Sequence, residues 1–215
     1  MKHGLIFDLD GTLVDSLQGI TASLNHALTL SGLPVHPPVA VRGFIGNGAR
    51  ILIQRAAPAG SPVDLLDRLE QAFKTDYDAT WPAGTFAYDG IHPLLETLQA
   101  RGYPLAVLSN KPHPFTVAMV SRLFPAIRFS PVLGQRPGIP HKPDPAGAIE
   151  AARSMGRLPQ SCVVIGDSTM DVDTARNAGM QAIAVTWGFH DRERLVAAGA
   201  EHLADSPDEL SRRFP

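Results

Sequence analysis

A short apolar stretch near the N-terminus ends in two acidic residues, and this feature constrains the fold most. Leu5-Ile6-Phe7 has the composition of a buried strand, and Asp8-Leu9-Asp10-Gly11-Thr12 follows it directly. Residues two apart in an extended chain point to the same side, so Asp8 and Asp10 should face one small volume. Two carboxylates that close repel each other unless a cation or a shared proton lies between them.

The residues after the two aspartates favour a turn. Gly11 lets the chain turn sharply with its backbone amides exposed, and Thr12 adds a hydroxyl group. Carboxylates, free amide donors and a hydroxyl together predict a site for a divalent cation and an anionic substrate. The alternative is a strand that ends in a polar turn, with Asp15 or Ser16 capping the next helix.

Composition excludes several classes of protein. The chain has 215 residues, enough for one large domain or for a core domain with a small second one. Its formal net charge of −2 offers no basic field for nucleic acid, and its apolar runs are too short to span a bilayer. Met1-Lys2-His3 leaves no room for a signal peptide, and the single cysteine, Cys162, allows no internal disulfide. We therefore expect a cytoplasmic protein.

The region after the first strand has the pattern of helices alone. Apolar residues recur at helical spacing over residues 17–28 and 63–80, and a helical segment between them pauses at residues 44–48. We therefore expect an all-helical cap domain over residues 16–81, inserted into a core domain formed by residues 1–15 and 82–215. The linkers on both sides are rich in turn residues and could act as hinges. The alternative is a single rigid domain of mixed structure.

The rest of the chain alternates between strands and helices. Short apolar stretches lie at residues 105–108, 132–133, 163–165 and 182–185, and helical patterns lie at residues 91–100, 115–123, 145–155 and 171–178. Such alternation is typical of a parallel sheet covered by helices on both faces. The expected fold class is therefore α/β, with a Rossmann-like parallel sheet as the core and the helical cap inserted after the first strand.

Polar residues follow the predicted strands where ligands bind in open parallel sheets, beyond the carboxyl ends. Ser109-Asn110-Lys111-Pro112 follows one strand, Gly166-Asp167-Ser168-Thr169-Met170-Asp171 follows another, and Lys142-Pro143-Asp144-Pro145 precedes a helix. Each stretch alone has a structural explanation, as a helix cap, a solvated lysine or an acidic first turn of a helix. Cys162 fits a core position better than a nucleophile, and the histidines lack the spacing of a zinc site.

In this order, the four polar stretches resemble the signatures of the haloacid dehalogenase superfamily. Those signatures are D-x-D-G-T-[LV], a Ser or Thr after the second motif strand, a Lys beside a helix start, and G-D-[ST]-x-x-D. The resemblance covers nearly the whole chain. It implies a Mg²⁺-dependent phosphatase that works through a phosphoaspartate intermediate, and the presence of Asp10 argues against carbon–halogen cleavage.

The chemistry of phosphate-ester hydrolysis assigns a role to each residue. Asp8 would be the nucleophile, and Asp10 would protonate the leaving oxygen and later deprotonate the attacking water. Ser109 and Asn110 would donate hydrogen bonds to the phosphoryl oxygens, and Lys142 would offset their charge and hold Asp8 ionised. The resemblance implies these Mg²⁺ ligands: the Asp8 carboxylate, the Asp10 carbonyl, the Asp167 carboxylate and, directly or through water, Asp171.

The cap is expected to select the substrate. Phe44-Ile45-Gly46-Asn47-Gly48-Ala49-Arg50 resembles the cap of bacterial phosphoglycolate phosphatases, and Ser109-Asn110-Lys111-Pro112 is close to their second motif. Amides around Gly46, Asn47 and Gly48 could bind a small carboxylate at a helix start, with charge added by Arg42 or Arg50. This favours 2-phosphoglycolate, although the same glycines also suit a tight corner between helices.

Other functions stay open on the sequence alone. A β-phosphoglucomutase-like mutase shares this core and cap type, and a pyrophosphatase or another small-phosphate hydrolase fits the same signatures. A non-catalytic phosphate-binding protein is a further alternative, but such a protein should have lost Asp8 or Asp10. We expect a small phosphate ester as the partner, no nucleic acid or membrane, and a monomer or homodimer.

Overall fold

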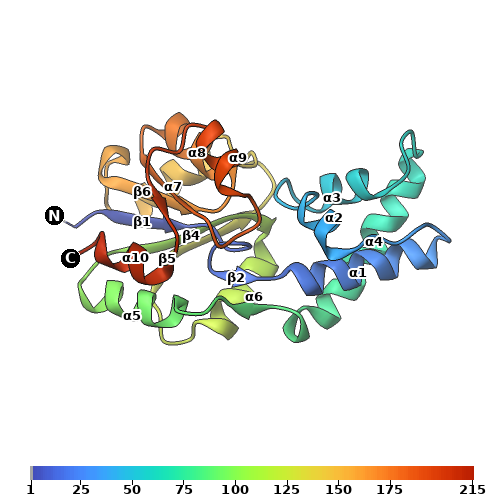
Figure 1. Cartoon of the computed structure of the whole chain (residues 1–215), viewed down its shortest axis with the longest axis horizontal. Coiled ribbons are helices and arrows are strands. Elements are labelled where there is room, and N and C mark those ends of the chain that lie inside the picture. Colours follow the sequence, from blue (N-terminus) through green and yellow to red (C-terminus); the bar gives the residue numbers. More distant parts are fainter. Residues whose placement is uncertain (1) are drawn as a thin grey trace. The chain divides into compact units, whose positions relative to one another are not determined.

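The computed structural model describes residues 2–215 and contains a six-stranded parallel sheet. The strand order is β5-β4-β1-β6-β7-β8 (Figure 1). The strands are β1 (Gly4–Phe7), β4 (Leu105–Pro112), β5 (Phe129–Gln135), β6 (Cys162–Gly166), β7 (Gln181–Val185) and β8 (Leu203–Ala204). This confirms the α/β class with a parallel, Rossmann-like sheet.

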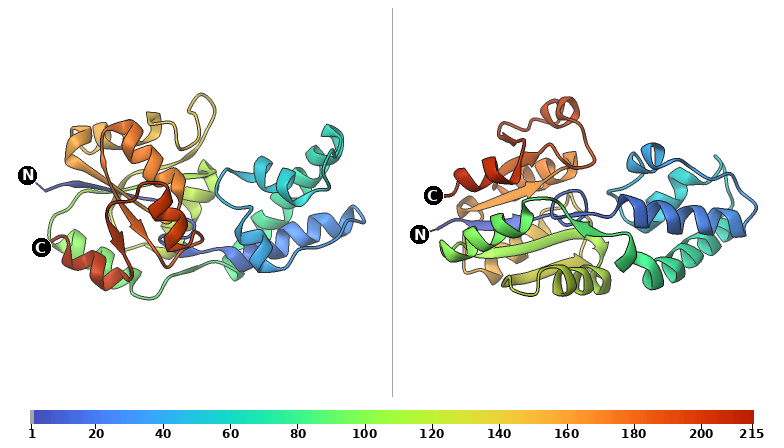
Figure 2. Two further views of the ribbon diagram at one scale, coloured as in Figure 1. Left: turned by 45° about the horizontal axis from the view of Figure 1, so that its top comes forward. Right: turned by 60° about the horizontal axis from the view of Figure 1, so that its bottom comes forward.

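Helices cover both faces of the sheet. They are α5 (Ile91–Ala100), α6 (His113–Leu123), α7 (Ala146–Ser154), α8 (Thr169–Ala178), α9 (Arg192–Ala197) and α10 (Pro207–Arg212). Helices α5, α6 and α10 lie on one face, and α7, α8 and α9 lie on the other (Figures 1 and 2). The strand order places β1 between β4 and β6, so the ends of these three strands meet at one edge.

The alternation of side chains along the strands builds the core. Ile6, Val164 and Leu108 point to one face, where they pack with alanines of α7 and α8 and with Cys162. Small alanine side chains let these helices approach the sheet closely. Cys162 is fully buried in this cluster, which agrees with its expected place in the core.

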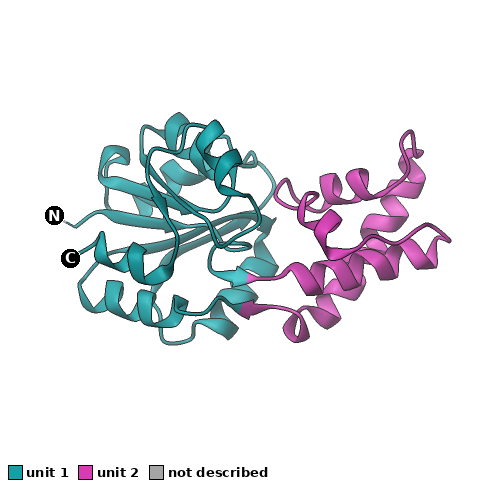
Figure 3. Ribbon diagram, viewed as in Figure 1, with its two compact units in different colours: residues 1–14, 87–215 teal, residues 15–86 magenta. Residues whose placement is uncertain are grey.

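The chain divides into two compact units (Figure 3). Unit 1 comprises Met1–Val14 and Ala87–Pro215 and contains the sheet; unit 2 comprises Asp15–Phe86. Unit 2 contains α1 (Leu17–Leu30), α2 (Pro38–Arg42), α3 (Ala49–Ala56), α4 (Val63–Thr80) and the 3₁₀ helix η1 (Trp81–Ala83). The chain crosses from one unit to the other within β2 (Val14–Asp15) and again within β3 (Phe86–Ala87). These two strands pair as a small second sheet.

Helix packing in unit 2 follows the predicted apolar faces. Ile20, Leu24 and Leu28 of α1 are buried, as are Leu69 and Phe73 of α4. Helices α1 and α4 pack against each other, so their apolar faces form the core of this unit. The assignment of this unit as a separate cap domain that selects the substrate stays a prediction.

The structure contains elements that the sequence patterns did not predict. Strand β8 has two residues, and α9 and α10 have six each, which is too short for a periodic pattern to develop. Strand β4 also continues to Pro112, four residues beyond its predicted end, because its polar end keeps pairing with β5 after an irregularity in register. None of the helices over residues 2–215 combines the length and the apolarity that crossing a bilayer requires.

Candidate active site

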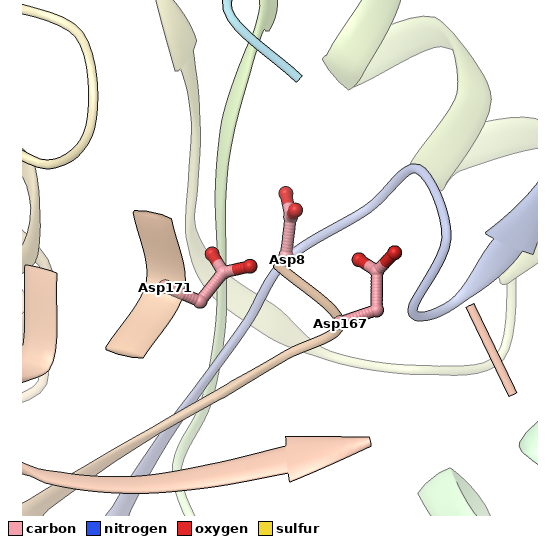
Figure 4. A group of neighbouring side chains, drawn as sticks. All are labelled: Asp8, Asp167 and Asp171. Atoms are coloured by element: carbon pink, nitrogen blue, oxygen red, sulfur yellow. The ribbon is translucent and has the colours of Figure 1, made fainter. Parts of the chain in front are cut away.

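Three carboxylates gather at the carboxyl edge of the sheet (Figure 4). Asp8 follows β1, Asp167 follows β6, and Asp171 lies in the first turn of α8. One oxygen atom from each of them lies within 4.8 Å of the others, and all three residues are buried. The structure therefore brings together residues more than 150 positions apart, as the rule for strand ends predicts.

Lys142 supplies positive charge to this cluster. Its Nζ lies 2.9 Å from Asp8 Oδ1 and 2.6 Å from Asp171 Oδ1, and it donates to the Leu108 carbonyl at 3.2 Å. Burial alone would lower the pKa of this lysine, but the carboxylates of Asp171 and Asp8 outweigh burial and hold the pKa above its ordinary value. Lys142 therefore stays charged at physiological pH.

One ammonium does not balance three buried carboxylates. Burial, opposed by the charge of Lys142 and assisted by that of Asp171, raises the pKa of Asp8 from 3.8 to about 7. Burial and the charges of Asp8 and Asp171 also raise the pKa of Asp167 well above its usual range. The site therefore favours any additional cation that the carboxylates can reach.

Asp167 is oriented by groups from two other segments. Its Oδ1 accepts from the Thr12 hydroxyl at 3.1 Å, and its Oδ2 accepts from the Phe189 amide at 2.7 Å. The structure thus gives the Thr12 hydroxyl a carboxylate as its partner. A contact between Thr12 and the substrate stays a prediction.

The backbone amides of the turn after Asp10 donate hydrogen bonds to carbonyl groups of the same segment. Gly11 donates to the Val14 carbonyl at 2.8 Å, and Thr12 and Leu13 donate to the Leu9 carbonyl at 3.3 and 2.9 Å. This corrects the expectation of free donors at Gly11 and Thr12, because the turn is tight enough to close its own hydrogen bonds. Gly11 has a φ of +85°, and a Cβ there would lie 2.2 Å from Asp167 Oδ2, so glycine is required for this turn to approach the carboxylate. A substrate contact of Gly11 stays a prediction.

The second half of β4 carries Ser109 and Asn110, which are both buried. The Ser109 hydroxyl accepts from the Lys111 amide at 3.2 Å. Asn110 Oδ1 accepts from the Lys142 amide at 2.8 Å, and Asn110 Nδ2 donates to the Lys142 carbonyl at 3.2 Å. The Asn110 side chain therefore fixes the backbone of the lysine, which differs from the expected contact with phosphoryl oxygens; that contact stays a prediction.

Asp10 forms an ion pair that the sequence did not indicate. Lys111 Nζ lies 3.1 Å from both carboxylate oxygens of Asp10. The Lys111 side chain is 7% exposed and that of Asp10 is 13% exposed, so the pair is largely removed from water. Lys111 stands inside the predicted Ser109-Asn110-Lys111-Pro112 stretch but had no assigned role.

The predicted substrate-binding residues of unit 2 form contacts within that unit. Arg50 Nη1 lies 2.6 Å from Asp67 and 3.2 Å from Glu70, so two carboxylates already offset its charge. Asn47 Oδ1 accepts from Arg55 at 2.8 Å, which ties the loop before α3 to that helix. Gly46 and Gly48 have φ values of 123° and 82°, a backbone that favours glycine, so the corner between helices explains them on structural grounds. Their contacts with a substrate stay predictions.

The loop after β7 contributes to the site and was missed. Gly188 has no room for a side chain, because a Cβ would lie 2.2 Å from Asp167 Cβ and from the Gly11 carbonyl. Its neighbours Trp187 and Phe189 donate to the Thr12 carbonyl at 3.0 Å and to Asp167. The one available signal was its position at the carboxyl end of a predicted strand, because Thr186 is the only polar residue between that strand and Phe189.

The donor set suits a hard divalent cation. Asp8 and Asp167 offer carboxylate oxygens, which Mg²⁺ prefers. Their pKa values are raised chiefly by burial and also by the neighbouring carboxylates, so a bound cation would offset the cost of their charges. Asp171 Oδ1 is bound to Lys142, and its Oδ2 accepts from the Ser168 amide at 3.1 Å and the Ser168 hydroxyl at 2.6 Å. Its two oxygens are therefore already engaged, which favours contact with a cation through water.

Comparison with known proteins agrees with the geometry. The family model described as haloacid dehalogenase-like hydrolase matches residues 5–185. The phosphoglycolate phosphatase of Mesorhizobium japonicum is 34% identical to this chain, and the match covers 98% of this chain and 95% of that protein. The phosphoglycolate phosphatase of Escherichia coli is 33% identical, and the match covers 97% of this chain and 90% of that protein. The crystal structure of a predicted phosphoglycolate phosphatase from Haemophilus somnus has a TM-score of 0.93 and 28% identity, with 100% of this chain and 98% of that one covered.

Proposed function

Because the chain belongs to the haloacid dehalogenase-like hydrolase family, we propose that this phosphatase hydrolyses 2-phosphoglycolate through a phosphoaspartate on Asp8. The main structural support is the gathering of the Asp8, Asp167 and Asp171 carboxylates beside Lys142. Such a cluster is expensive to bury unless it serves a charged substrate and a cation.

The first half of the reaction transfers the phosphoryl group to the protein. An oxygen of Asp8 attacks phosphorus, and the bond between phosphorus and the ester oxygen breaks. The leaving oxygen takes a proton from the Asp10 carboxyl group, so glycolate departs with this oxygen as a neutral hydroxyl group. Lys142 Nζ, at 2.9 Å from Asp8 Oδ1, holds the nucleophile in position and balances charge near the phosphoryl group.

The second half restores the enzyme. A water molecule attacks phosphorus, the Asp10 carboxylate takes one of its protons, and the bond between phosphorus and the Asp8 oxygen breaks. Inorganic phosphate leaves, Asp8 is again a carboxylate and Asp10 is again protonated. Ser109, buried in the second half of β4, would donate a hydrogen bond to the phosphoryl oxygens in both halves.

Mg²⁺ is the proposed cofactor. The carboxylates of Asp8 and Asp167 and the Asp10 carbonyl would hold it, with Asp171 contributing through water. When bound, the ion neutralises the charge of the phosphoryl group against the carboxylates. The enzyme would work in the cytoplasm on a small molecule, without nucleic acid or membrane, as a monomer or homodimer.

The test is phosphate release from a panel of small esters with Mg²⁺. We expect turnover of p-nitrophenyl phosphate, faster turnover of 2-phosphoglycolate, and loss of both in Asp8→Asn. Retention of most activity by Asp8→Asn would refute the nucleophile. Interconversion of sugar phosphates without net phosphate release would favour a mutase, and binding of phosphate analogues without any turnover would favour a binding protein.

A further inference from the structure

We propose that Lys111 selects the substrate by binding a carboxylate in the leaving group, next to the group that protonates the leaving oxygen. This inference rests on the proposed function, because it takes Asp10 as the proton donor. It places a specificity determinant in unit 1, whereas the sequence predicted one in the loop before α3 of unit 2.

The position of the ammonium carries the argument. Lys111 Nζ lies 3.1 Å from both oxygens of Asp10, and Asp10 has to lie within hydrogen-bond distance of the ester oxygen to protonate it. In 2-phosphoglycolate the carboxylate carbon is only two bonds from that ester oxygen. An ammonium beside Asp10 is therefore also beside the place where the substrate carboxylate has to be.

The backbone around Lys111 is held firmly, so the side chain starts from a fixed point. The Lys111 amide donates to the Ser109 hydroxyl at 3.2 Å, and its carbonyl accepts from the Thr116 hydroxyl at 3.1 Å. Gly134 of β5 packs so close that a Cβ there would lie 2.7 Å from the Lys111 carbonyl oxygen. A fixed cation discriminates between ligands better than a mobile one, because less entropy is lost on binding.

Two other cations of the predicted site, Lys142 and Arg50, are held by carboxylates away from the leaving group. The three donors of Lys142 match Asp8, Asp171 and the Leu108 carbonyl. Arg50 is paired with two carboxylates in unit 2. Lys111 differs from Lys142 because its contact is with the residue that serves the leaving group rather than with the nucleophile.

Stability alone is a poor explanation for this ion pair. Burying a lysine and an aspartate together gives little net stability compared with two apolar residues of similar size. A substrate carboxylate would instead give the ammonium a second anion to bind. An ester with a neutral leaving group would lose this contact and keep all the others.

The experiment compares two esters that differ in one group. 2-Phosphoglycolate and 2-hydroxyethyl phosphate share the ester oxygen and the methylene, but the second has an alcohol in place of the carboxylate. The ratio of their kcat/KM values is measured with Mg²⁺ in the wild-type protein, Lys111→Met and Lys111→Arg. Lys2→Met is the control, because Lys2 is a lysine of unit 1 that donates to the Pro215 carbonyl at 2.6 Å.

We expect the wild-type protein and Lys2→Met to prefer 2-phosphoglycolate. Lys111→Met should reduce that preference on the order of 10- to 100-fold, the range for one lost hydrogen bond to a charged group. Lys111→Arg should retain part of the preference, because it keeps a positive charge beside Asp10. If Lys111→Met does not fold, the arginine variant still provides the comparison with the wild-type protein.

Two results would overturn the inference while leaving the phosphatase intact. One is turnover of both esters by the wild-type protein without preference. The other is an equal loss on both esters in the Lys111 variants, which is what a purely structural role predicts. If the wild-type protein hydrolyses neither ester, the proposed function fails and the inference fails with it.

Discussion

Replacing Asp8, the proposed nucleophile, should make the metal-free protein more stable, and the gain should depend on pH. Asp8→Asn removes a charge from a buried cluster but keeps the shape of the side chain. The amide oxygen of asparagine can still accept from the Leu9 amide and from Lys142, which lie 2.7 and 2.9 Å from Asp8 Oδ1. The free energy of unfolding of the asparagine variant should therefore resemble that of the wild-type protein with Asp8 protonated.

The size of the effect follows from the pKa of Asp8. Folding raises this pKa from 3.8 to about 7, chiefly by burial, so the native state holds a proton that the unfolded chain releases. The ionised carboxyl group therefore lowers stability increasingly as pH rises from 4 to 7. At about 1.4 kcal/mol for each pKa unit, linkage gives a penalty of roughly 4 kcal/mol at pH 8 and less than half of that at pH 5. Asp8→Asn relieves this penalty.

The assay is urea denaturation of both proteins at pH 5 and pH 8, with a chelator present throughout. Asp78→Asn is the matched control, because Asp78 is an exposed aspartate on α4 of unit 2. We expect a gain in the free energy of unfolding at pH 8 at least twice that at pH 5, and no comparable gain in the control. An equal gain at both pH values, or a loss at pH 8, would refute the charge argument. Saturating Mg²⁺ should narrow the difference, because the ion binds the native wild-type site.

Three further results are expected. Asp10→Asn should lower phosphate release from 2-phosphoglycolate on the order of 10²- to 10⁴-fold, as for loss of a general acid and base, and a smaller loss would remove that role from Asp10. Gly188→Ala should reduce the free energy of unfolding by about 2 kcal/mol or more and should also reduce activity, because the added methyl group has to displace Asp167. Urea titration and phosphate assays measure the two effects, and a variant as stable and as active as the wild type would contradict this packing. Chelation with EDTA should end phosphate release and added Mg²⁺ should restore it, and persistent activity in EDTA would exclude the proposed cofactor.

The carboxylate cluster was predictable because ligands bind beyond the carboxyl ends of parallel strands. Asp8 and Asp167 follow β1 and β6, Asp171 lies in the first turn of the helix that comes next, and the three do lie together. The pairing of Asp8 with Asp10, expected because residues two apart in a strand share a side, is not part of this cluster, and Asp10 pairs with Lys111 instead. The parallel sheet was predictable because its strands are short apolar runs of regular spacing.

The contacts that orient these residues were not predictable. Asn110 bonds to the backbone of Lys142, and Thr12 bonds to Asp167, so both hydrogen-bonding side chains serve protein groups. Lys111 is paired with Asp10, but a lysine in a polar stretch gives no sign of which way it points. Such choices depend on tertiary geometry, which periodicity and motif spacing do not encode.

The loop after β7 supports Asp167 with main-chain atoms, and this affects how the site tolerates sequence change. The Phe189 amide provides the hydrogen bond at 2.7 Å, so every amino acid except proline at that position carries the same donor. Gly188 is the opposite case, because what it supplies is the lack of a side chain. Position 189 therefore tolerates changes of side-chain chemistry and position 188 tolerates none, although both help to hold the same carboxylate.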